Sequence, residues 1–137
     1  MKFISTASGV HFEIVRNEEA NPHSDCTVRA EIQTAFGNFS GENTAVHFSA
    51  FDMFRKRFEE FLETRQGEVV LEMTEDTSLT FFRWNAKGDV GVRFTLSRYA
   101  YLGDPMKTCP IALRGEFPID GEYLSRLPME LSQLAER

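Results

Sequence analysis

Several features that would point to a definite chemistry are missing from this chain of 137 residues. Its only two cysteines, Cys26 and Cys109, lie far apart and form no CxxC pair, which favours buried thiols over a zinc site or a disulfide framework. No P-loop, GxGxxG turn, GxSxG elbow or HExxH helix is present. We therefore expect no enzyme activity, no metal and no cofactor.

Long apolar runs and positive charge are also scarce. No window approaches the roughly 20 apolar residues that span a membrane, and the start of the chain lacks the apolar run of a secretory signal, so we expect a cytoplasmic protein. The chain has 15 basic and 21 acidic residues, a net charge of −6. Nucleic acids and anionic lipids bind through Lys and Arg, so neither is an expected partner, whereas a basic protein is.

What the chain does contain is enough apolar material for one folded domain, residues 1–137. It is 42% apolar and includes 13 phenylalanines. The clearest pattern runs from Phe48 to Gly67 and predicts a helix, with Ser49 as N-cap, Asp52 in a capping box and Gly67 closing the end. Its apolar residues recur every three or four positions: Phe51, Phe54, Phe58, Phe61 and Leu62.

Alternating apolar and polar residues predict strands on both sides of this helix. The expected strands are residues 2–6, 10–14, 28–36, 44–48, 69–73, 79–84, 90–96 and 109–117. We expect a polar loop from Asn17 to Asp25 and a longer connection from Tyr99 to Lys107. Asp120 should cap a second helix, which Pro128 should kink or split.

This order of elements predicts an α+β domain. The expected architecture is an antiparallel meander sheet of six to eight strands, with two helices packed on one face. The other face of that sheet should then be polar and open to solvent. A strongly curved sheet, closing into a half-barrel or cone with the helix in its mouth, is the alternative.

Several of these segments resemble one known group of proteins. The resemblance runs from about Val28 onward and rests on the phenylalanine helix, 67–72 (GEVVLE), 79–81 (LTF), 88–92 (GDVGV), and 117–120 (FPID) leading into Tyr123, Leu124 and Leu127. In this order they resemble the WapI-type immunity proteins and related uncharacterised bacterial families. The resemblance implies a small non-enzymatic protein that binds and neutralises a cognate toxin, often a nuclease. It implies no site residue.

An acidic protein could block a nuclease by occupying the basic surface that attracts phosphate. The candidate contacts are the carboxylates of the open sheet face and its adjacent turn: Glu13, Glu31, Glu72, Glu75, Asp76 and Glu116. The three histidines are better explained as solvated or hydrogen-bonded structural residues, because nothing in the sequence brings ligands or carboxylates to them.

Two other functions stay open at this stage. A small-molecule binder or enzyme would use a pocket between helix and sheet, with Trp84, Tyr99 or His47 as polar markers. A self-associating protein would use an uncovered sheet edge or face, so a homo-oligomer is a further possibility.

Overall fold

The computed structural model describes residues 2–5, 9–21 and 24–135, and within them the chain forms nine strands, two α-helices and one 3-10 turn. The first sheet contains β1 (Lys2–Ser5), β2 (Val10–Asn21), β3 (Ser24–Thr34) and β4 (Gly37–Val46). The second contains β5 (Phe48–Ser49), β6 (Glu68–Met73), β7 (Ser78–Arg83), β8 (Val90–Leu102) and β9 (Lys107–Pro118). The remaining elements are α1 (Phe51–Thr64), η2 (Thr74–Asp76) and α2 (Gly121–Ala135).

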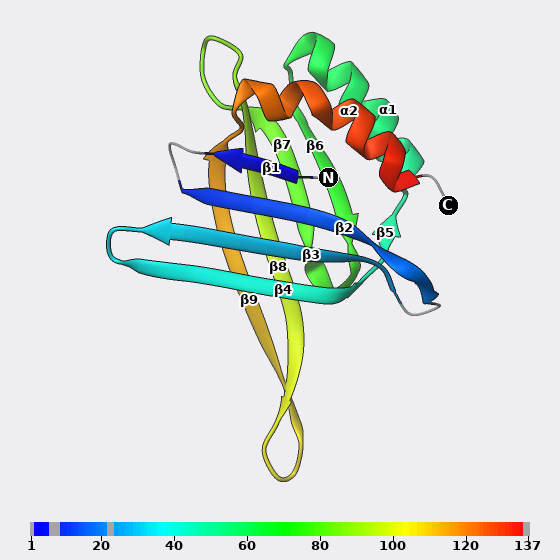
Figure 1. Cartoon of the computed structure of the whole chain (residues 1–137), viewed down its shortest axis with the longest axis vertical. Helices are drawn as coiled ribbons and strands as arrows, with labels where there is room; N and C mark the ends of the chain where they lie inside the picture. The colour runs from blue at the N-terminus through cyan, green and yellow to red at the C-terminus, as the bar shows by residue number, and fades with distance from the viewer. Residues whose placement is uncertain (1, 6–8, 22–23, 136–137) are drawn as a thin grey trace.

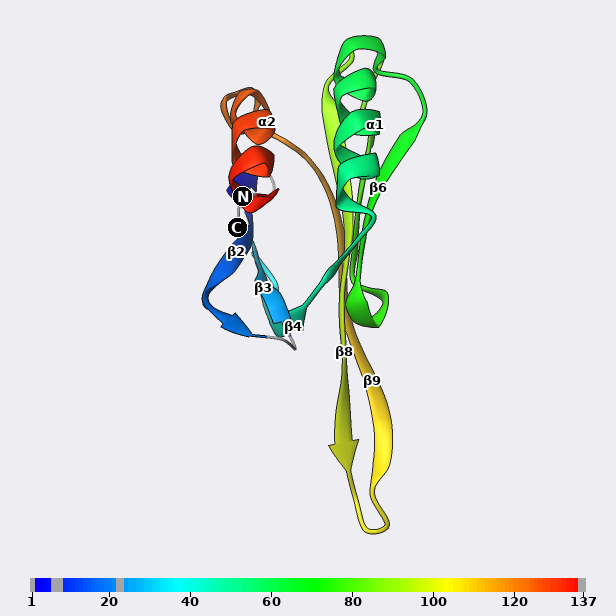
Figure 2. The same ribbon diagram turned by 90° about the vertical axis from the view of Figure 1, so that its right-hand side faces the viewer.

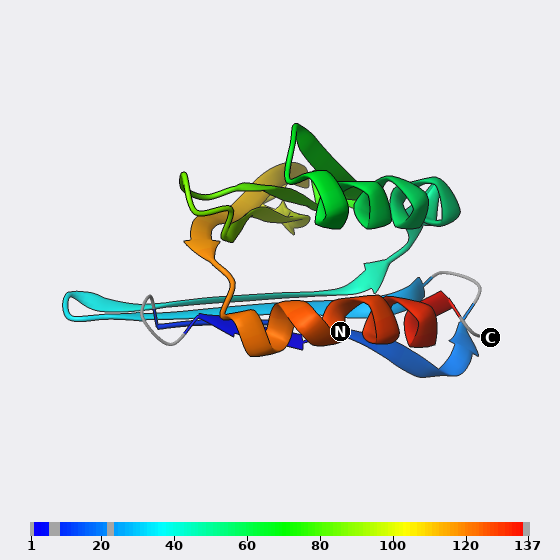
Figure 3. The ribbon, with the colours of Figure 1, turned by 90° about the horizontal axis from the view of Figure 1, so that it is seen from above.

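The two sheets lie face to face, and their strands cross steeply (Figure 1). Seen from the side, α2 lies in the layer of β1–β4 and α1 in the layer of β6–β9 (Figure 2). The view from above shows both helices at the same end of the two layers, with α2 packed beside β1 and α1 beside β6 (Figure 3). Each helix thus lies along one side of a sheet.

The predicted α+β class, the antiparallel pairing and the packing of both helices against sheet are confirmed. The prediction of one continuous sheet is wrong, because the chain leaves the first sheet after Val46 and begins the second at Phe48. Alternation shows that each strand has an apolar face. It does not show whether a helix or another sheet covers that face.

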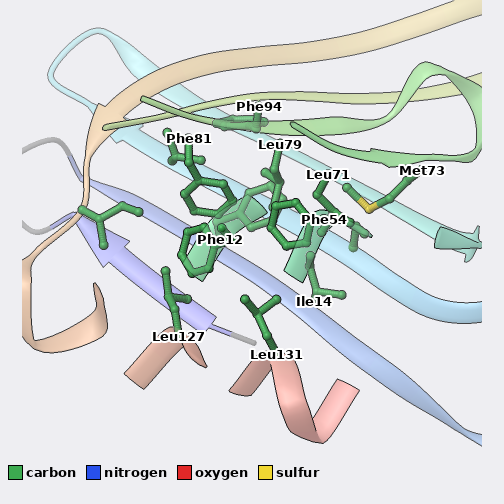
Figure 4. Close-up of a cluster of buried hydrophobic side chains, with 14 of the residues drawn as sticks. Phe12, Ile14, Phe54, Leu71, Met73, Leu79, Phe81, Phe94, Leu127 and Leu131 are labelled. Carbon is green, nitrogen blue, oxygen red and sulfur yellow. The ribbon is translucent and has the colours of Figure 1, made fainter. Parts of the chain in front are cut away.

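The core lies between the sheets and extends under both helices. Figure 4 shows Phe12 and Ile14 from the first sheet pointing toward Leu79 and Phe94 of the second, and these four side chains are buried. The ring centroids of Phe12 and Phe94 are 5.2 Å apart, a normal distance for an aromatic pair. One layer of side chains therefore joins the two halves of the chain.

The phenylalanine stripe predicted for α1 is confirmed. Phe54, Phe58 and Phe61 are buried, and the rings of Phe58 and Phe81 on β7 are 4.9 Å apart. The ends of the helix differ from the prediction. Ala50, in a left-handed conformation, takes the N-cap position expected for Ser49, and its side chain makes no capping hydrogen bond. At the other end the C-cap is Arg65, which is left-handed as Gly67 also is, and the Arg65 N–H donates to the Phe61 carbonyl at 2.7 Å.

The second helix is a single element from Gly121 to Ala135, so Pro128 does not split it. The Asp120 carbonyl accepts the Tyr123 and Leu124 N–H groups, which places Asp120 at the start as predicted. None of the helices among the described residues combines the length and apolar character needed to cross a membrane.

Buried hydrogen bonds fix the point where β4 crosses β8. The Ser97 carbonyl of β8 accepts one bond from Asn43 Nδ2 of β4 at 2.9 Å and another from Thr77 Oγ1 at 3.0 Å. The Ser97 N–H donates to the same Thr77 oxygen at 3.1 Å. Because Asn43, Thr77 and Ser97 are all buried, these bonds hold the two sheets at one position.

Two of the expected connections are strands instead. The loop predicted from Asn17 to Asp25 is wrong: β2 continues to Asn21 and β3 begins at Ser24, with residues 22 and 23 outside the described part. The connection predicted from Tyr99 to Lys107 is also wrong, since β8 continues to Leu102 and pairs with β9 from Lys107 onward. Figure 1 shows the end of this hairpin extending beyond the sandwich. We call residues 98–111 the arm.

Candidate functional site

The six carboxylates proposed from the sequence do not share one surface. Glu13 and Glu31 belong to β2 and β3 of the first sheet, whereas Glu72 and Glu116 belong to β6 and β9 of the second. All four alternate with buried residues of their strands and so point outward from the sandwich. Glu75 and Asp76 lie in the η2 turn. The open face predicted for a single sheet is therefore two faces on opposite sides of the molecule.

The outer face of the first sheet has a shallow depression of about 320 Å³. We call it the acidic depression, and it is lined by His11, Glu13, Arg29, Ala30, Glu31, Ser40, Gly41 and Glu42. Three carboxylates and one guanidinium give these residues a charge of −2 with His11 neutral. The sequence analysis identified Glu13 and Glu31 but missed Glu42, which is brought opposite Arg29 by the β3–β4 register.

Arg29 organises the acidic depression. Its Nε donates a short hydrogen bond to Glu42 Oε2, and its guanidinium lies 3.9 Å from Glu13 Oε2. The hydrogen bond and the charge of Glu42 raise the pKa of Arg29 above its ordinary value. Glu31 accepts a hydrogen bond from Gln33 Nε2 at 3.2 Å. Because Gln33 is neutral, this bond does not compensate the negative charge of Glu31. Two carboxylates are thus held in place by one cation, beside a third that is available to a cationic partner.

The outer face of the second sheet has a different balance of charge. Arg93 Nε donates to Glu116 Oε2 at 2.9 Å, and its guanidinium lies 3.6 Å from Glu68 Oε1 and 4.9 Å from the centre of the Phe82 ring. The Glu116 hydrogen bond raises the pKa of Arg93. Arg93 thus lies between two carboxylates on this face, as Arg29 does on the first sheet.

A larger depression, of about 500 Å³, lies where α1 begins. It is lined by Arg16, Asp25, Cys26, Phe48, Ala50, Phe51, Asp52, Met53 and Leu134. The polar markers predicted for a ligand pocket do not line it: Trp84 and Tyr99 lie on the second sheet, and His47 is hydrogen-bonded through Nδ1 to Asp25 at 3.0 Å. Burial raises the pKa of the Cys26 thiol to about 11, with a further contribution from Asp25, so this thiol is a poor nucleophile.

Among the residues that the structure describes, no three His, Cys, Asp or Glu side chains are placed so that they could hold a metal ion. Of the histidines, His11 lines the acidic depression, His47 bonds to Asp25, and His23 lies outside the described residues.

The arm is the feature that the sequence analysis missed. Tyr99, Tyr101, Leu102, Met106 and Ile111 are all exposed on it. The alternation of Tyr99 and Tyr101 with smaller residues indicates a strand, whereas the Gly103-Asp104-Pro105 turn favours a long loop, which was the prediction.

Comparison with known proteins gives one match. A family model described as the immunity protein WapI-like family matches residues 2–137, which extends the resemblance seen from Val28 to nearly the whole chain. No curated protein and no solved structure matches.

Proposed function

Because the chain belongs to the immunity protein WapI-like family, we propose that it binds a cognate toxin and neutralises it by covering the toxin's functional surface. The match over residues 2–137 is the observation that carries this proposal. In this proposal the protein acts by binding alone, without catalysis. The described side chains form exposed charged faces around a core rich in phenylalanine, which is consistent with such a role.

The acidic depression is the surface that we propose for toxin binding. Arg29 is hydrogen-bonded to Glu42 and within ion-pair distance of Glu13, which restricts the Glu42 side chain before a partner binds. Glu31 adds a carboxylate whose bond to Gln33 leaves its charge uncompensated. Together with the net charge of −6, this arrangement would attract a basic protein surface and speed its approach.

A nuclease is the toxin class that best fits this charge, because its active site must attract phosphate and is therefore basic. Carboxylates held along a β-sheet could occupy the positions that phosphates take in the substrate. The protein would compete with nucleic acid for the toxin without binding nucleic acid itself. The carboxylates outside the depression, Glu72, Glu75, Asp76 and Glu116, are proposed as secondary contacts of a large toxin.

The proposal can be tested with the C-terminal domain of a large toxin, if one is encoded next to the gene for this protein. Co-expression of the two should restore growth to cells that the toxin domain alone kills. The purified proteins should form a complex whose affinity falls as salt is raised, because the attraction is between opposite charges.

Charge reversal then tests the surface separately from the function. Glu31→Lys should weaken the complex by about tenfold or more, since one favourable contact becomes a repulsive one. Glu60→Lys, at an exposed position of α1 that is not among the proposed contacts, is the matched control and should change affinity much less. If the complex forms but Glu60→Lys is the more harmful change, the acidic depression is the wrong surface. If no complex forms and growth is not restored, the proposed function fails.

A further inference from the structure

Each sheet has one edge beside a helix and one edge that is left uncovered. Helix α2 lies beside β1, and α1 lies beside β6 next to the two-residue strand β5. On the other side, β4 and β9 end their sheets, and no strand of the described residues pairs with their outer edges. Long uncovered edges of this kind readily accept another chain.

A notch lies where the arm leaves the sandwich beneath β4. It has a volume of about 390 Å³ and is lined by Asn38, Phe39, Ser40, Gly41 and Glu42 from β4 and by Leu96, Arg98, Ile111, Ala112 and Leu113 from β8 and β9. Phe39 and Ile111 are 57% and 51% exposed, although both are large apolar side chains. The notch thus has one large apolar side chain, Phe39, on its β4 wall and three, Leu96, Ile111 and Leu113, on the wall from β8 and β9.

One side of the arm is both apolar and cationic. Arg98 pairs with Ile111, and Leu102 pairs with Lys107, and directly opposed residues of antiparallel strands share a face. Arg98 and Leu102 also lie an even number of residues from Leu96, which points into the sandwich, so this is the side that continues from the notch.

The charge of the arm is opposite to that of the rest of the chain. Arg98 and Lys107 against Asp104 give residues 98–111 a charge of +1, which leaves −7 for all other residues. Glu42 lines both the notch and the acidic depression, so negative charge begins at the notch and continues across the first sheet to Glu31. The arm extends beyond the layer formed by β2, β3 and β4, whose outer face carries these carboxylates (Figure 2). A second copy can bring them together.

We propose that two copies of this chain form a symmetric dimer in which the arm of each copy lies in the notch of the other. Leu102 and Ile111 of one arm pack against Phe39 of the other copy, and Lys107 approaches the carboxylates that begin at Glu42. A two-fold axis makes the two contacts identical and closes the assembly at two. The arm residues on this one side and the eight further residues of the notch make a contact smaller than the roughly 20 to 30 residues a side of a stable interface, which fits a dimer that dissociates on dilution. This inference does not rest on the toxin, but an arm that reaches Glu42 would compete with a toxin for that residue.

Sedimentation of the full chain tests the assembly. We expect a dimer at concentrations up to about 100 μM that dissociates on dilution. Raising the salt from about 50 mM to about 500 mM should weaken it several-fold, because part of the attraction is between opposite charges. Ile111→Ser should weaken it at least about tenfold, since an apolar side chain is lost from the interface. Met129→Ser is the control, because Met129 is 58% exposed on α2, away from the arm. A protein that stays monomeric, or a dimer that Ile111→Ser leaves intact, overturns the proposal.

Cross-linking tests the geometry of the contact. Cys109 lies on the arm, and Cys26 is buried and stays out of the reaction. A tagged F39C/C109S chain mixed with the natural chain can form only one interface disulfide, from residue 39 of one copy to Cys109 of the other. We expect this mixed disulfide under mild oxidation, and little of it from an M129C/C109S chain under the same conditions. Equal yields from the two variants would mean random collision and would contradict the arm-in-notch arrangement.

Discussion

Two glycines in the second sheet provide a matched test of how its faces are packed. Gly91 on β8 and Gly115 on β9 both have backbone conformations that other residues adopt, so a change to alanine adds a methyl group without backbone strain. At Gly115 that methyl carbon would lie 2.5 Å from Cε1 and 2.8 Å from Cζ of Phe94. At Gly91 it would lie 2.6 Å from the Trp84 ring and 2.9 Å from the Phe82 ring. The clashes are equally close, and the substitutions differ in what can move.

Phe94 has nowhere to go, because it is fully buried and its ring packs on Phe12 at 5.2 Å and on Phe117 at 6.0 Å. Overpacking of this kind costs about 1–3 kcal/mol, and Gly→Ala returns only about 0.4–1 kcal/mol through the unfolded state. Gly115→Ala should therefore lower the free energy of unfolding by about 1–2 kcal/mol. Trp84 is 39% exposed and can swing outward, so Gly91→Ala should change it by less than about 1 kcal/mol.

Urea unfolding followed by circular dichroism measures both changes. Trp84 is the only tryptophan in the chain, so its fluorescence reports separately whether its ring has moved. For Gly91→Ala we expect an altered emission spectrum with near-normal stability. For Gly115→Ala we expect an unaltered emission spectrum with lower stability. If Gly91→Ala proved as destabilising as Gly115→Ala, the rings of Trp84 and Phe82 would be held as tightly as those of the core. The assignment of inner and outer faces would then be wrong.

Three further predictions concern the core. Phe58→Ala should lower the free energy of unfolding by about 3–5 kcal/mol, whereas Met53→Ala on the exposed side of the same helix should cost less than about 1 kcal/mol; urea titration compares them. Asn43→Ala should cost about 0.5–1.5 kcal/mol, because it removes one of the two side-chain hydrogen bonds to the buried Ser97 carbonyl of β8, and unchanged thermal unfolding would count against this bond. In native protein, iodoacetamide should label Cys109 and spare Cys26. The pKa of Cys26 rises to about 11 in the folded state from an ordinary 9.0. The free energy of unfolding should therefore fall by roughly 3 kcal/mol as the pH rises between those values, because the unfolded chain loses this proton first. Cys26→Ala should remove that part of the pH dependence.

The elements that the sequence predicted well are those whose pattern is local. Phe54, Phe58 and Phe61 recur at helical spacing, so the helix and its buried side followed directly. The strand from Val90 was equally clear, because every second residue is apolar. Whether two such strands share a sheet depends on partners far away in the chain, and alternation carries no information about them. The exchange of sheets at His47 was missed for that reason.

The candidate surfaces show the same limit. Glu13 and Glu31 were recognised as outward residues because they alternate with apolar ones. Their association with Glu42 depends on the register between β3 and β4, and the separation from Glu116 depends on there being two sheets. The arm was missed because its strand pattern continues through a turn rich in glycine and proline, which on its own is typical of a loop.

The path of the chain through the two layers has a consequence for how it folds. Strand β1, which begins the first layer, is flanked by α2, the last helix of the described chain, while everything between Phe48 and Pro118 builds the second layer. A chain shortened before Gly121 would leave Phe12 and Ile14 without Leu127 and Leu131 above them, so its amino-terminal hairpins should stay loosely packed and prone to aggregate until α2 has been synthesised. Completion of the first layer waits on α2.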